Sequence, residues 1–454
     1  MQHIWFEAAL LADGWVRGVR LAVGEDGRIA ALVCGVEAQA DDQRGGIALP
    51  GLANVHSHAF QRGMAGLAEY RGSDNDDFWS WRALMYRFLD RLNPDDIEAI
   101  AALAYAEMLE TGFTRVGEFH YLHHAPDGSG YADPAELAAR IAAAAETTGI
   151  GLTLLPVFYR YAGFDRRPPE HGHIRFVTDC DGFARLFERS RAAIAGLPDA
   201  NIGIAPHSLR AVDTGDLAEI LSLVPGGPVH IHAAEQTGEV EQCVAALGAR
   251  PVEWLLDHAG VDARWCLIHA THLDPAETAR LARSGAVAGL CPITEANLGD
   301  GIFPAPAFLA SGGRFAIGTD SNIVIDPARE LQTMEYAQRL VLRKRNLLAS
   351  NTEPSTGSRL FGGALSGGAQ ALGQSSAGLA IGAPADIVGL DPDALAMVGR
   401  GPEMALDSWI FAGGHDVVCD VWRRGRHLVV GGRHIAREEI AARYQRTMIK
   451  LLSD

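Results

Sequence analysis

The sequence predicts an α/β protein with a (β/α)8 barrel and a small β-sandwich domain built from both ends of the chain. Three observations support this fold class. Short apolar runs alternate with Ala/Leu/Glu/Arg-rich helical stretches between about residues 49 and 325. Eight such runs can be counted, the number that closes a barrel. Both chain ends are instead rich in short β-like runs separated by Gly turns.

The expected barrel strands are apolar runs that end in polar residues. They are residues 47–59, 114–121, 151–159, 201–208, 227–235, 265–273, 286–293 and 314–322. Between them, apolar residues recur at helical spacing, and several of these stretches end in Gly, as helix C-termini prefer. Examples are 96–112, 133–149 and 275–285. An open, doubly wound sheet is the competing arrangement, but eight strands favour the barrel.

The chain is expected to divide into four parts. Residues 1–48 and 377–435 supply the two halves of the β-sandwich, residues 49–376 form the barrel, and residues 436–454 form a C-terminal helix. DG and GG pairs between apolar runs at both ends are hairpin signals. The Gly/Ser-rich segment 357–378 is either a linker or contains a short helix.

Composition limits the classes of partner. The net charge of −17 argues against nucleic acid and against an anionic membrane surface. The 6 cysteines show no CxxC spacing, which is typical of reduced thiols in an intracellular protein. We find no signal-peptide pattern and no apolar run near the roughly 20 residues that span a bilayer. We therefore expect a soluble cytoplasmic protein, and a homodimer, which is common for this fold.

Metal-binding residue types follow the predicted strands where each one ends. His56 and His58 end the first strand, His232 the fifth, His269 the sixth and Asp320 the eighth. A lone histidine is more often a packed core residue than a ligand. Several ionisable groups at strand ends, on the face where barrels carry their chemistry, favour a metal site. Three imidazoles and one carboxylate suit Zn²⁺ with a position left for water.

The motifs around these residues resemble the amidohydrolase superfamily, in its aminohydrolase branch. The motifs are PGLANVHSHAF, HIHAAEQTGEVE, LIHATHL and GTDSN. The resemblance implies a single metal ion, zinc or else iron, held by His56, His58, His232 and Asp320. It also implies catalytic roles for Glu235, His269 and Asp320. APHSLR at the fourth strand has no lysine, so the carboxylated lysine of binuclear members is missing and a second metal is not expected.

The loop motifs resemble the members of this superfamily that act on N-formimino-L-glutamate in histidine degradation. These motifs are HSHAFQRGMAGL, GEFHYLHH, APHSLR and CPITEANLGDGIFP. The resemblance implies hydrolytic deamination to N-formyl-L-glutamate and ammonia, with five residues around the substrate: Gln61, Arg82, Tyr121, His207 and Arg210. Arginine forms bidentate hydrogen bonds to carboxylates, which suits an anionic amidine with two such groups.

The expected mechanism and its rivals can be stated in the same terms. Asp320 takes a proton from the attacking water, His269 assists it or polarises the reacting group, and Glu235 carries a proton to the departing nitrogen. A deaminase of a guanine-like or triazine-like ring would share the metal site and differ in its loops. A non-catalytic metal-binding protein is the alternative from another class, although it would need neither Glu235 nor His269.

Overall fold

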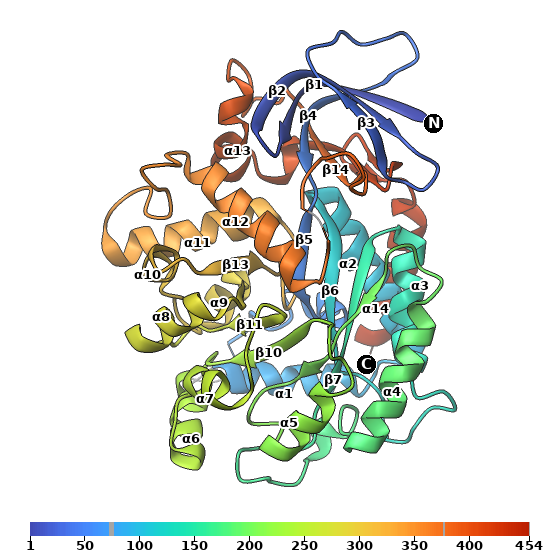
Figure 1. Cartoon of the computed structure of the whole chain (residues 1–454). Coiled ribbons are helices and arrows are strands. Elements are labelled where there is room, and N and C mark those ends of the chain that lie inside the picture. Colours follow the sequence, from blue (N-terminus) through green and yellow to red (C-terminus); the bar gives the residue numbers. More distant parts are fainter. Residues whose placement is uncertain (72–76, 376, 454) are drawn as a thin grey trace.

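The computed structural model describes residues 1–71, 77–375 and 377–453. The middle of the chain forms parallel strands flanked by helices, and the two ends of the chain meet in a separate sheet (Figure 1). The protein is therefore α/β, as the sequence predicts.

The parallel strands form two sheets. The first contains β5 (Leu52–Ser57), β6 (Phe113–His120), β7 (Gly151–Phe158), β8 (Asn201–Ile202) and β9 (Ala205–Pro206). The second contains β10 (Val229–Ala233), β11 (Trp265–His269), β12 (Val287–Leu290) and β13 (Arg314–Ile317). Isolated bridges join their edges, between Ile204 and Val229 and between Ser57 and Asp320. The strand ends of both sheets therefore face one region.

Helices follow most of these strands and cover them from outside. After β5 come α1 (Phe78–Leu89) and α2 (Pro94–Thr111), and further along the chain come α3 (Glu136–Thr148), α4 (Cys180–Ile194), α5 (Thr214–Leu221), α6 (Thr237–Leu247), α7 (Pro251–His258), α8 (Pro275–Ser284), α9 (Pro292–Leu298), α10 (Ala305–Ala310), α11 (Pro327–Leu342) and α12 (Thr356–Ala371). Side chains of Asn93 and Asp274 cap the N-termini of α2 and α8. Gly112 and Gly285 end the same helices with positive φ, which a glycine adopts at low cost.

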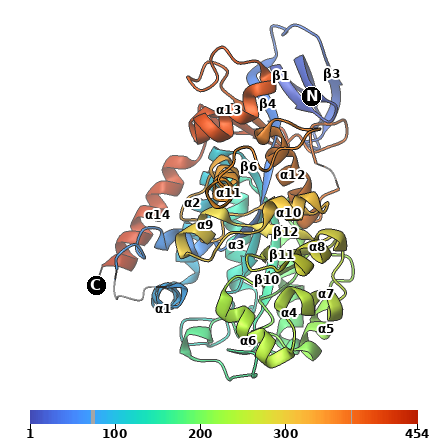
Figure 2. The same cartoon turned by 90° about the vertical axis from the view of Figure 1, so that its left-hand side faces the viewer.

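The chain ends form one mixed sheet, in the order β17-β16-β15-β14-β4-β1-β2-β3. Its strands are β1 (Gln2–Leu11), β2 (Gly14–Val23), β3 (Ile29–Val33), β4 (Gln43–Pro50), β14 (Ile387–Leu390), β15 (Val418–Arg423), β16 (Arg426–Val430) and β17 (Arg433–His434). The short helix α13 (Ala405–Ser408) lies in the segment between β14 and β15. The last helix, α14 (Arg437–Leu452), packs along α2 (Figure 2).

The apolar run at residues 47–59 forms two strands instead of the single strand expected from the sequence. β4 ends at Pro50 and pairs with β1 and β14, whereas β5 begins at Leu52 and pairs with β6. Gly51 lies between them, where a Cβ atom would overlap the side chain of Thr114. The glycine lets the chain pass from the mixed sheet into the first parallel sheet.

The Gly/Ser-rich segment is mostly helical. α12 runs through it from Thr356 to Ala371 and packs on β13 and β5. A Cβ atom on Gly367 would overlap the carbonyl group of Phe315, and one on Gly368 would lie 3.1 Å from the Cβ of Ala53. The glycines on this face of the helix therefore allow its backbone to contact the strands directly.

Buried charges link the mixed sheet to the parallel sheets. Arg423 at the end of β15 donates hydrogen bonds to Asp386 at 2.9 Å and to Asp199 at 2.6 Å. Arg115 on β6 donates to the other carboxylate oxygen of Asp199 at 2.7 Å. Both arginine side chains are 3% exposed. The two guanidinium groups and two carboxylates balance each other's charge.

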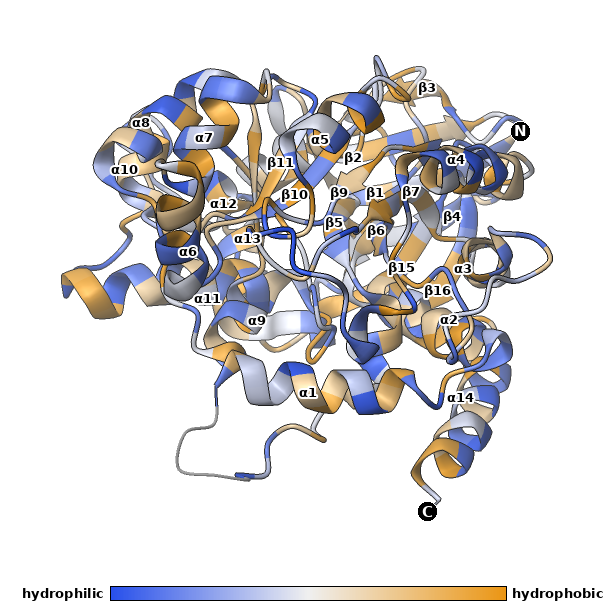
Figure 3. Cartoon of the chain, turned by 90° about the horizontal axis from the view of Figure 1, so that it is seen from below, coloured by the Kyte–Doolittle hydropathy of each residue, from blue (hydrophilic) through white to orange (hydrophobic). Residues whose placement is uncertain are grey.

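Polar and apolar residues alternate along most of the outer helices in the view from below (Figure 3). Within the described part of the chain, every helix is too short or too polar to cross a membrane.

Candidate active site

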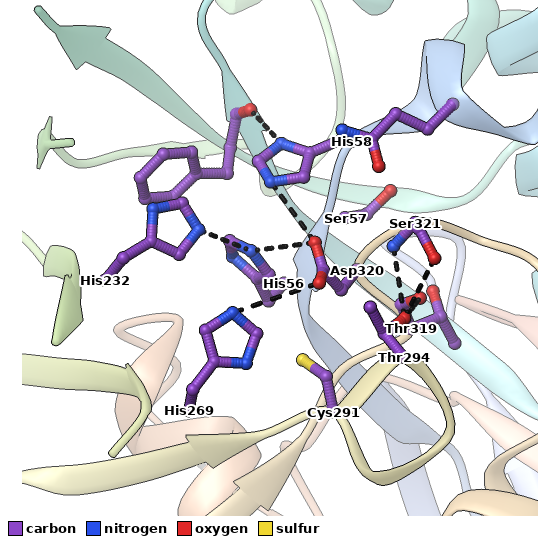
Figure 4. A network of polar contacts seen from close by, with 12 residues as sticks. His56, Ser57, His58, His232, His269, Cys291, Thr294, Thr319, Asp320 and Ser321 are labelled. Carbon is purple, nitrogen blue, oxygen red and sulfur yellow. Dashed lines mark hydrogen bonds and ion pairs between the residues drawn. The ribbon is translucent and has the colours of Figure 1, made fainter. Parts of the chain in front are cut away.

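Three histidines and one aspartate converge where the parallel strands end; we call them the His–Asp cluster (Figure 4). His56 and His58 come from β5, His232 from β10, and Asp320 follows β13. The Nε2 atoms of His56 and His58 each lie 3.3 Å from Oδ1 of Asp320. The Nε2 atoms of His56 and His232 are 3.1 Å apart. The ligand atoms lie close together in two overlapping groups, one of His56, His58 and His232 and one of His56, His269 and Asp320.

Backbone carbonyls set the orientation of two of these rings. Nδ1 of His58 lies 3.0 Å from the carbonyl oxygen of Phe119, and Nδ1 of His232 lies 3.1 Å from that of His207. A carbonyl oxygen only accepts, so each Nδ1 carries the proton and donates it. The lone pair of each Nε2 therefore points into the cluster, as metal ligation requires.

Burial keeps the imidazoles of the cluster neutral. It lowers the pKa of His56 to about 3, although hydrogen bonding to Asp320 opposes this shift. Burial also lowers the pKa of His58 and of His232, and for His232 the neighbouring histidines lower it further. Burial raises the pKa of Asp320, but His56 and His58 more than reverse this and hold it below its usual range. Neutral imidazoles and an ionised carboxylate are the metal-binding protonation states.

Three separations within the cluster are those of neighbouring ligands on one metal ion. Zinc–nitrogen and zinc–oxygen bonds of about 2.0–2.1 Å place neighbouring tetrahedral ligands about 3.3 Å apart. The measured separations of 3.1 and 3.3 Å match this edge length. The donor set of three nitrogens and one oxygen also suits zinc. The residues present therefore fit a single bound metal.

Side-chain hydrogen bonds hold β5 and the segment after β13 together. Asn54 on β5 donates to Oγ1 of Thr319 at 2.6 Å and accepts from its backbone N–H at 3.1 Å. Asn322 donates to the carbonyl oxygens of His58 and Asp320, both at 3.1 Å. Asp320 has a φ of 45°, an uncommon value for a residue other than glycine. The surrounding contacts thus sustain local strain where the ligand is presented.

Three ionisable side chains surround the cluster on its other side. Nε2 of His269 lies 3.8 Å from Glu235 and 3.9 Å from Asp320. Its Nδ1 lies 3.2 Å from Oε1 of Glu295, which orients the ring. Burial lowers the pKa of His269, but Glu235, Glu295 and Asp320 raise it to about 10. Burial raises the pKa of Glu235 to about 7, against the effect of His269. Glu235 can therefore exchange a proton with a reactant at neutral pH.

A cavity opens from the cluster toward α1. Gln61, Tyr121 and His207 line it together with His58, Glu235 and Asp320. Nε2 of Gln61 donates to the hydroxyl of Tyr121 at 3.0 Å, and that hydroxyl donates to the sulfur of Met85 at 3.2 Å. Oε1 of Gln61 is buried and has no hydrogen-bond partner among the described residues. The cavity wall therefore offers an acceptor for a donor on a bound molecule.

Two arginines face the same cavity without acidic partners. Arg82 and Arg210 both line it, and within the described ranges neither makes an ion pair or a side-chain hydrogen bond. Their guanidinium carbons lie 4.5 and 5.8 Å from the ring centre of Trp79. Burial lowers the pKa of Arg82, and Arg210 lowers it further although Tyr86 opposes the shift. Burial lowers the pKa of Arg210, but Tyr159 and, from beyond ion-pair distance, Glu239 and Glu235 more than reverse this and raise it. Two positive charges that face one cavity without a direct ion pair favour an anionic ligand.

The sequence and fold of the chain are similar to those of known proteins. The model of the Amidohydrolase family matches residues 47–427. The chain belongs to the amidohydrolase family. A second model, described as the N-terminal domain of formimidoylglutamate deiminase HutF, matches residues 1–46. The resemblance read from the sequence motifs is thereby confirmed at the level of the family.

Individual relatives of this amidohydrolase span its whole length. A formimidoylglutamate deiminase of Pseudomonas aeruginosa is 49% identical and covers 100% of both chains. The crystal structure of an amidohydrolase from Brucella melitensis is 53% identical, with a TM-score of 0.96 and 100% coverage of both chains. An adenosine deaminase from Xanthomonas campestris with bound zinc is 23% identical, with a TM-score of 0.81 and coverage of 99% and 98%. The last likeness shows the shared fold alone.

The structure also brings residues to the amidohydrolase site that sequence reasoning missed. Glu295 in CPITEAN contacts His269, and Glu239 in QTGEVE accepts from the backbone N–H groups of Ala234 and Glu235 at 3.1 and 3.0 Å. Both acids lie inside motifs quoted above, so their place in those motifs was the available signal. Tyr86, in contrast, lies in a loop helix and carried none.

Proposed function

We propose that this amidohydrolase is a zinc-dependent deiminase that hydrolyses N-formimino-L-glutamate to N-formyl-L-glutamate and ammonia, a step of histidine degradation. The full-length similarity to a formimidoylglutamate deiminase supports this proposal. So does the match of the first 46 residues to the HutF N-terminal domain. The observation that carries the substrate assignment is the pair Arg82 and Arg210, which both face the cavity and make no direct ion pair with an acid among the described residues.

Charge explains why this pair points to a dianion. The protein carries a net charge of −17, which repels acidic molecules at long range. Two guanidinium groups in one enclosed cavity reverse the sign locally, and each can bind a carboxylate through two hydrogen bonds. A neutral purine or triazine ring would leave both arginines desolvated and unpaired, which is costly. N-Formimino-L-glutamate has two carboxylates and would neutralise both.

His56, His58, His232 and Asp320 would hold one metal ion. Zinc, when bound, acts as a Lewis acid that makes hydroxide available from water near neutral pH. Iron remains the alternative metal for this donor set. The fourth strand presents His207 instead of a lysine, so we expect a mononuclear site.

The remaining groups would move protons and shape the substrate. Asp320 accepts a proton from the attacking water, and His269, 3.9 Å away, stabilises the carboxylate or polarises the reacting group. Water adds to the formimino carbon, the C–N bond to the terminal nitrogen breaks, and Glu235 delivers the proton with which ammonia leaves. Gln61, Tyr121 and His207 would contact the substrate from the cavity wall. His207 is neutral there because burial and Arg210 lower its pKa well below the usual value.

Ammonia release from three amidines tests the assignment. Zinc-loaded protein should hydrolyse N-formimino-L-glutamate well, N-formimino-L-aspartate poorly and guanine not at all. Arg82→Met and Arg210→Met should each lower kcat/KM for the dianion by roughly 10- to 100-fold, the loss of a charge-assisted hydrogen bond. Arg189→Met is the matched control, since that side chain is 57% exposed and pairs with Asp133 on the surface.

Each contrary result identifies a different error. Guanine turnover that ignores both arginine substitutions would replace our assignment with a ring deaminase. Bound zinc without ammonia release from any amidine would instead indicate a non-catalytic metal-binding protein.

Several further features of the molecule belong to the same proposal. We expect the two parallel sheets to form one closed (β/α)8 barrel within residues 49–376. The Ser57–Asp320 and Ile204–Val229 bridges join their edges. We expect the mixed sheet to act as a β-sandwich domain of residues 1–48 and 377–435, followed by the helix at 436–454. A homodimer in the cytoplasm, with no nucleic-acid or membrane partner, also remains our expectation.

A further inference from the structure

Tyr86 lies on the cavity wall next to Arg82, and a hydrogen bond orients its hydroxyl group. Tyr86 lies one turn after Arg82 on α1 and lines the same cavity. α1 lies at the outer edge of the molecule in two views (Figures 2 and 3). The hydroxyl of Tyr86 is 3.2 Å from Nε2 of His173, a buried residue in the single turn His171–His173. Neither residue has a role in the reaction described above.

The tautomer of His173 follows from its second nitrogen. The backbone N–H of Glu170 donates to Nδ1 of His173 at 3.1 Å, so Nδ1 is an acceptor and carries no proton. Burial, together with Arg82, lowers the pKa of His173 to about 4, so the ring is neutral at pH 7. A neutral imidazole holds one proton, which must then lie on Nε2 and be donated to the Tyr86 oxygen.

The hydroxyl hydrogen of Tyr86 is consequently left for another acceptor. Burial raises the pKa of Tyr86, so the hydroxyl keeps its hydrogen. Apart from His173, the described residues offer that hydroxyl no hydrogen-bond partner. Because the hydroxyl accepts from His173, its own hydrogen is free to be donated to an acceptor on a molecule in the cavity.

The aromatic ring cannot easily turn away from this position. A Cβ atom on Gly172 would overlap the Tyr86 ring, so the ring lies directly against the backbone of the turn that carries His173. Phe176 packs at a ring-centre distance of 6.2 Å on the same ring. The donor is therefore preorganised, and binding to it costs little side-chain entropy.

We infer that Tyr86 is a carboxylate-binding, specificity-determining residue, and that His173 is a positioning residue that aims the Tyr86 hydroxyl hydrogen into the cavity. This inference rests on the proposed function, because the acceptor is one carboxylate of the amidine substrate. The guanidinium carbon of Arg82 lies 5.5 Å from the centre of the Tyr86 ring. Because Arg82 and Tyr86 adjoin on one wall of the cavity, we expect both to bind the same carboxylate.

Removing only the hydroxyl tests Tyr86. Tyr86→Phe is assayed for ammonia release with N-formimino-L-glutamate and with two analogues that each lack one carboxylate, N-formimino-4-aminobutyrate and N-formimino-2-aminobutyrate. We expect KM for the full substrate to rise roughly 10- to 100-fold, with kcat changed far less, since a hydrogen bond to a charged acceptor is lost. With the analogue that lacks the bound carboxylate, wild type and variant should have equal KM.

Matched controls separate the hydroxyl from general damage. Tyr444→Phe removes a hydroxyl from α14 and should leave all three KM values unchanged. Zinc content and the unfolding midpoint should be equal in wild type and Tyr86→Phe. An equal penalty on both analogues, or unchanged KM on the full substrate, would overturn the inference while leaving the proposed function intact. A wild-type enzyme inactive on N-formimino-L-glutamate would instead remove the proposed function, and this inference with it.

The positioning role of His173 requires a double variant. His173→Phe keeps an aromatic ring but removes the donor, so it should raise KM for the full substrate and spare the same analogue that Tyr86→Phe spares. In the Tyr86→Phe background, His173→Phe should add less than about twofold, because its only route to the substrate is gone. Fully multiplicative penalties would show that His173 acts independently and would refute the tautomer argument.

Discussion

The buried charges between the mixed sheet and the parallel sheets provide a quantitative test of the fold. Asp199→Asn removes one negative charge and little volume. Asp199 has a φ of 51°, and both Asp and Asn tolerate that backbone region better than most residues. The substitution therefore isolates electrostatics from backbone strain.

The size of the effect follows from the partners that remain. Arg423 keeps Asp386 at 2.9 Å, but Arg115 keeps only neutral acceptors, such as the carbonyl oxygen of Leu152 at 3.2 Å. Burial lowers the pKa of Arg115, and Arg423 beside it lowers it further, so Asp199 offsets an unfavourable position. Breaking a buried ion pair costs about 3–5 kcal/mol. Because the side chain of Asp199 is 18% exposed, we expect the lower end, about 3 kcal/mol.

Urea unfolding of the zinc-loaded protein measures this loss. The matched control is Asp262→Asn, which removes a carboxylate that is 50% exposed and pairs with Arg264 on the surface. Its cost should stay below about 1 kcal/mol. If the two variants unfold at the same urea concentration, the buried network contributes no more than a surface pair, and our reasoning about the interface between the sheets is wrong.

Two further variants probe the active site and the glycine helix. Glu235→Gln should keep wild-type zinc content and lose about 10²- to 10⁴-fold in kcat, because proton delivery is lost while the His–Asp cluster is intact. Near-normal turnover would remove Glu235 from the mechanism. The exposed Glu241→Gln is the control. Gly367→Ala should lower the free energy of unfolding by about 1–3 kcal/mol, since its Cβ would overlap the carbonyl of Phe315. On the same helix, Gly362→Ala meets no atom within 4 Å and should be neutral or stabilising by up to about 1 kcal/mol; equal shifts for the two alanines would contradict the packing described for α12.

The convergence of the His–Asp cluster could be predicted from the sequence because each of its residues lies at the end of a predicted parallel strand. His56, His232 and Asp320 each follow an apolar run, and the ends of parallel strands meet at one face whatever the loops do. The family resemblance rested on the same motifs. The catalytic roles of these residues stay predictions, as do the domain boundaries.

Other features depend on contacts that sequence patterns do not express. The break at Gly51 arises because Thr114, far along the chain, occupies the space of a Cβ. The Gly/Ser-rich segment left a linker and a short helix both open, and packing of its glycines against β13 and β5 explains why the longer helix α12 forms. Tyr86 and His173 meet through two loops, and loop geometry has no periodicity from which it can be read.

The glycine face of α12 has a consequence for the metal. This helix touches β5 and β13, the two strands that lead to His56 and Asp320, at the opposite end from those ligands. The backbone of α12 fixes the distance between the helix axis and the two strands, because backbone atoms, unlike side chains, have no alternative rotamers. A methyl group added on the glycine face of α12 would push β5 and β13 apart. We expect the distance between the His56 nitrogen and the Asp320 oxygen to increase as a result. The geometry of the His–Asp cluster thus depends on a buried helix face that lies outside the cavity.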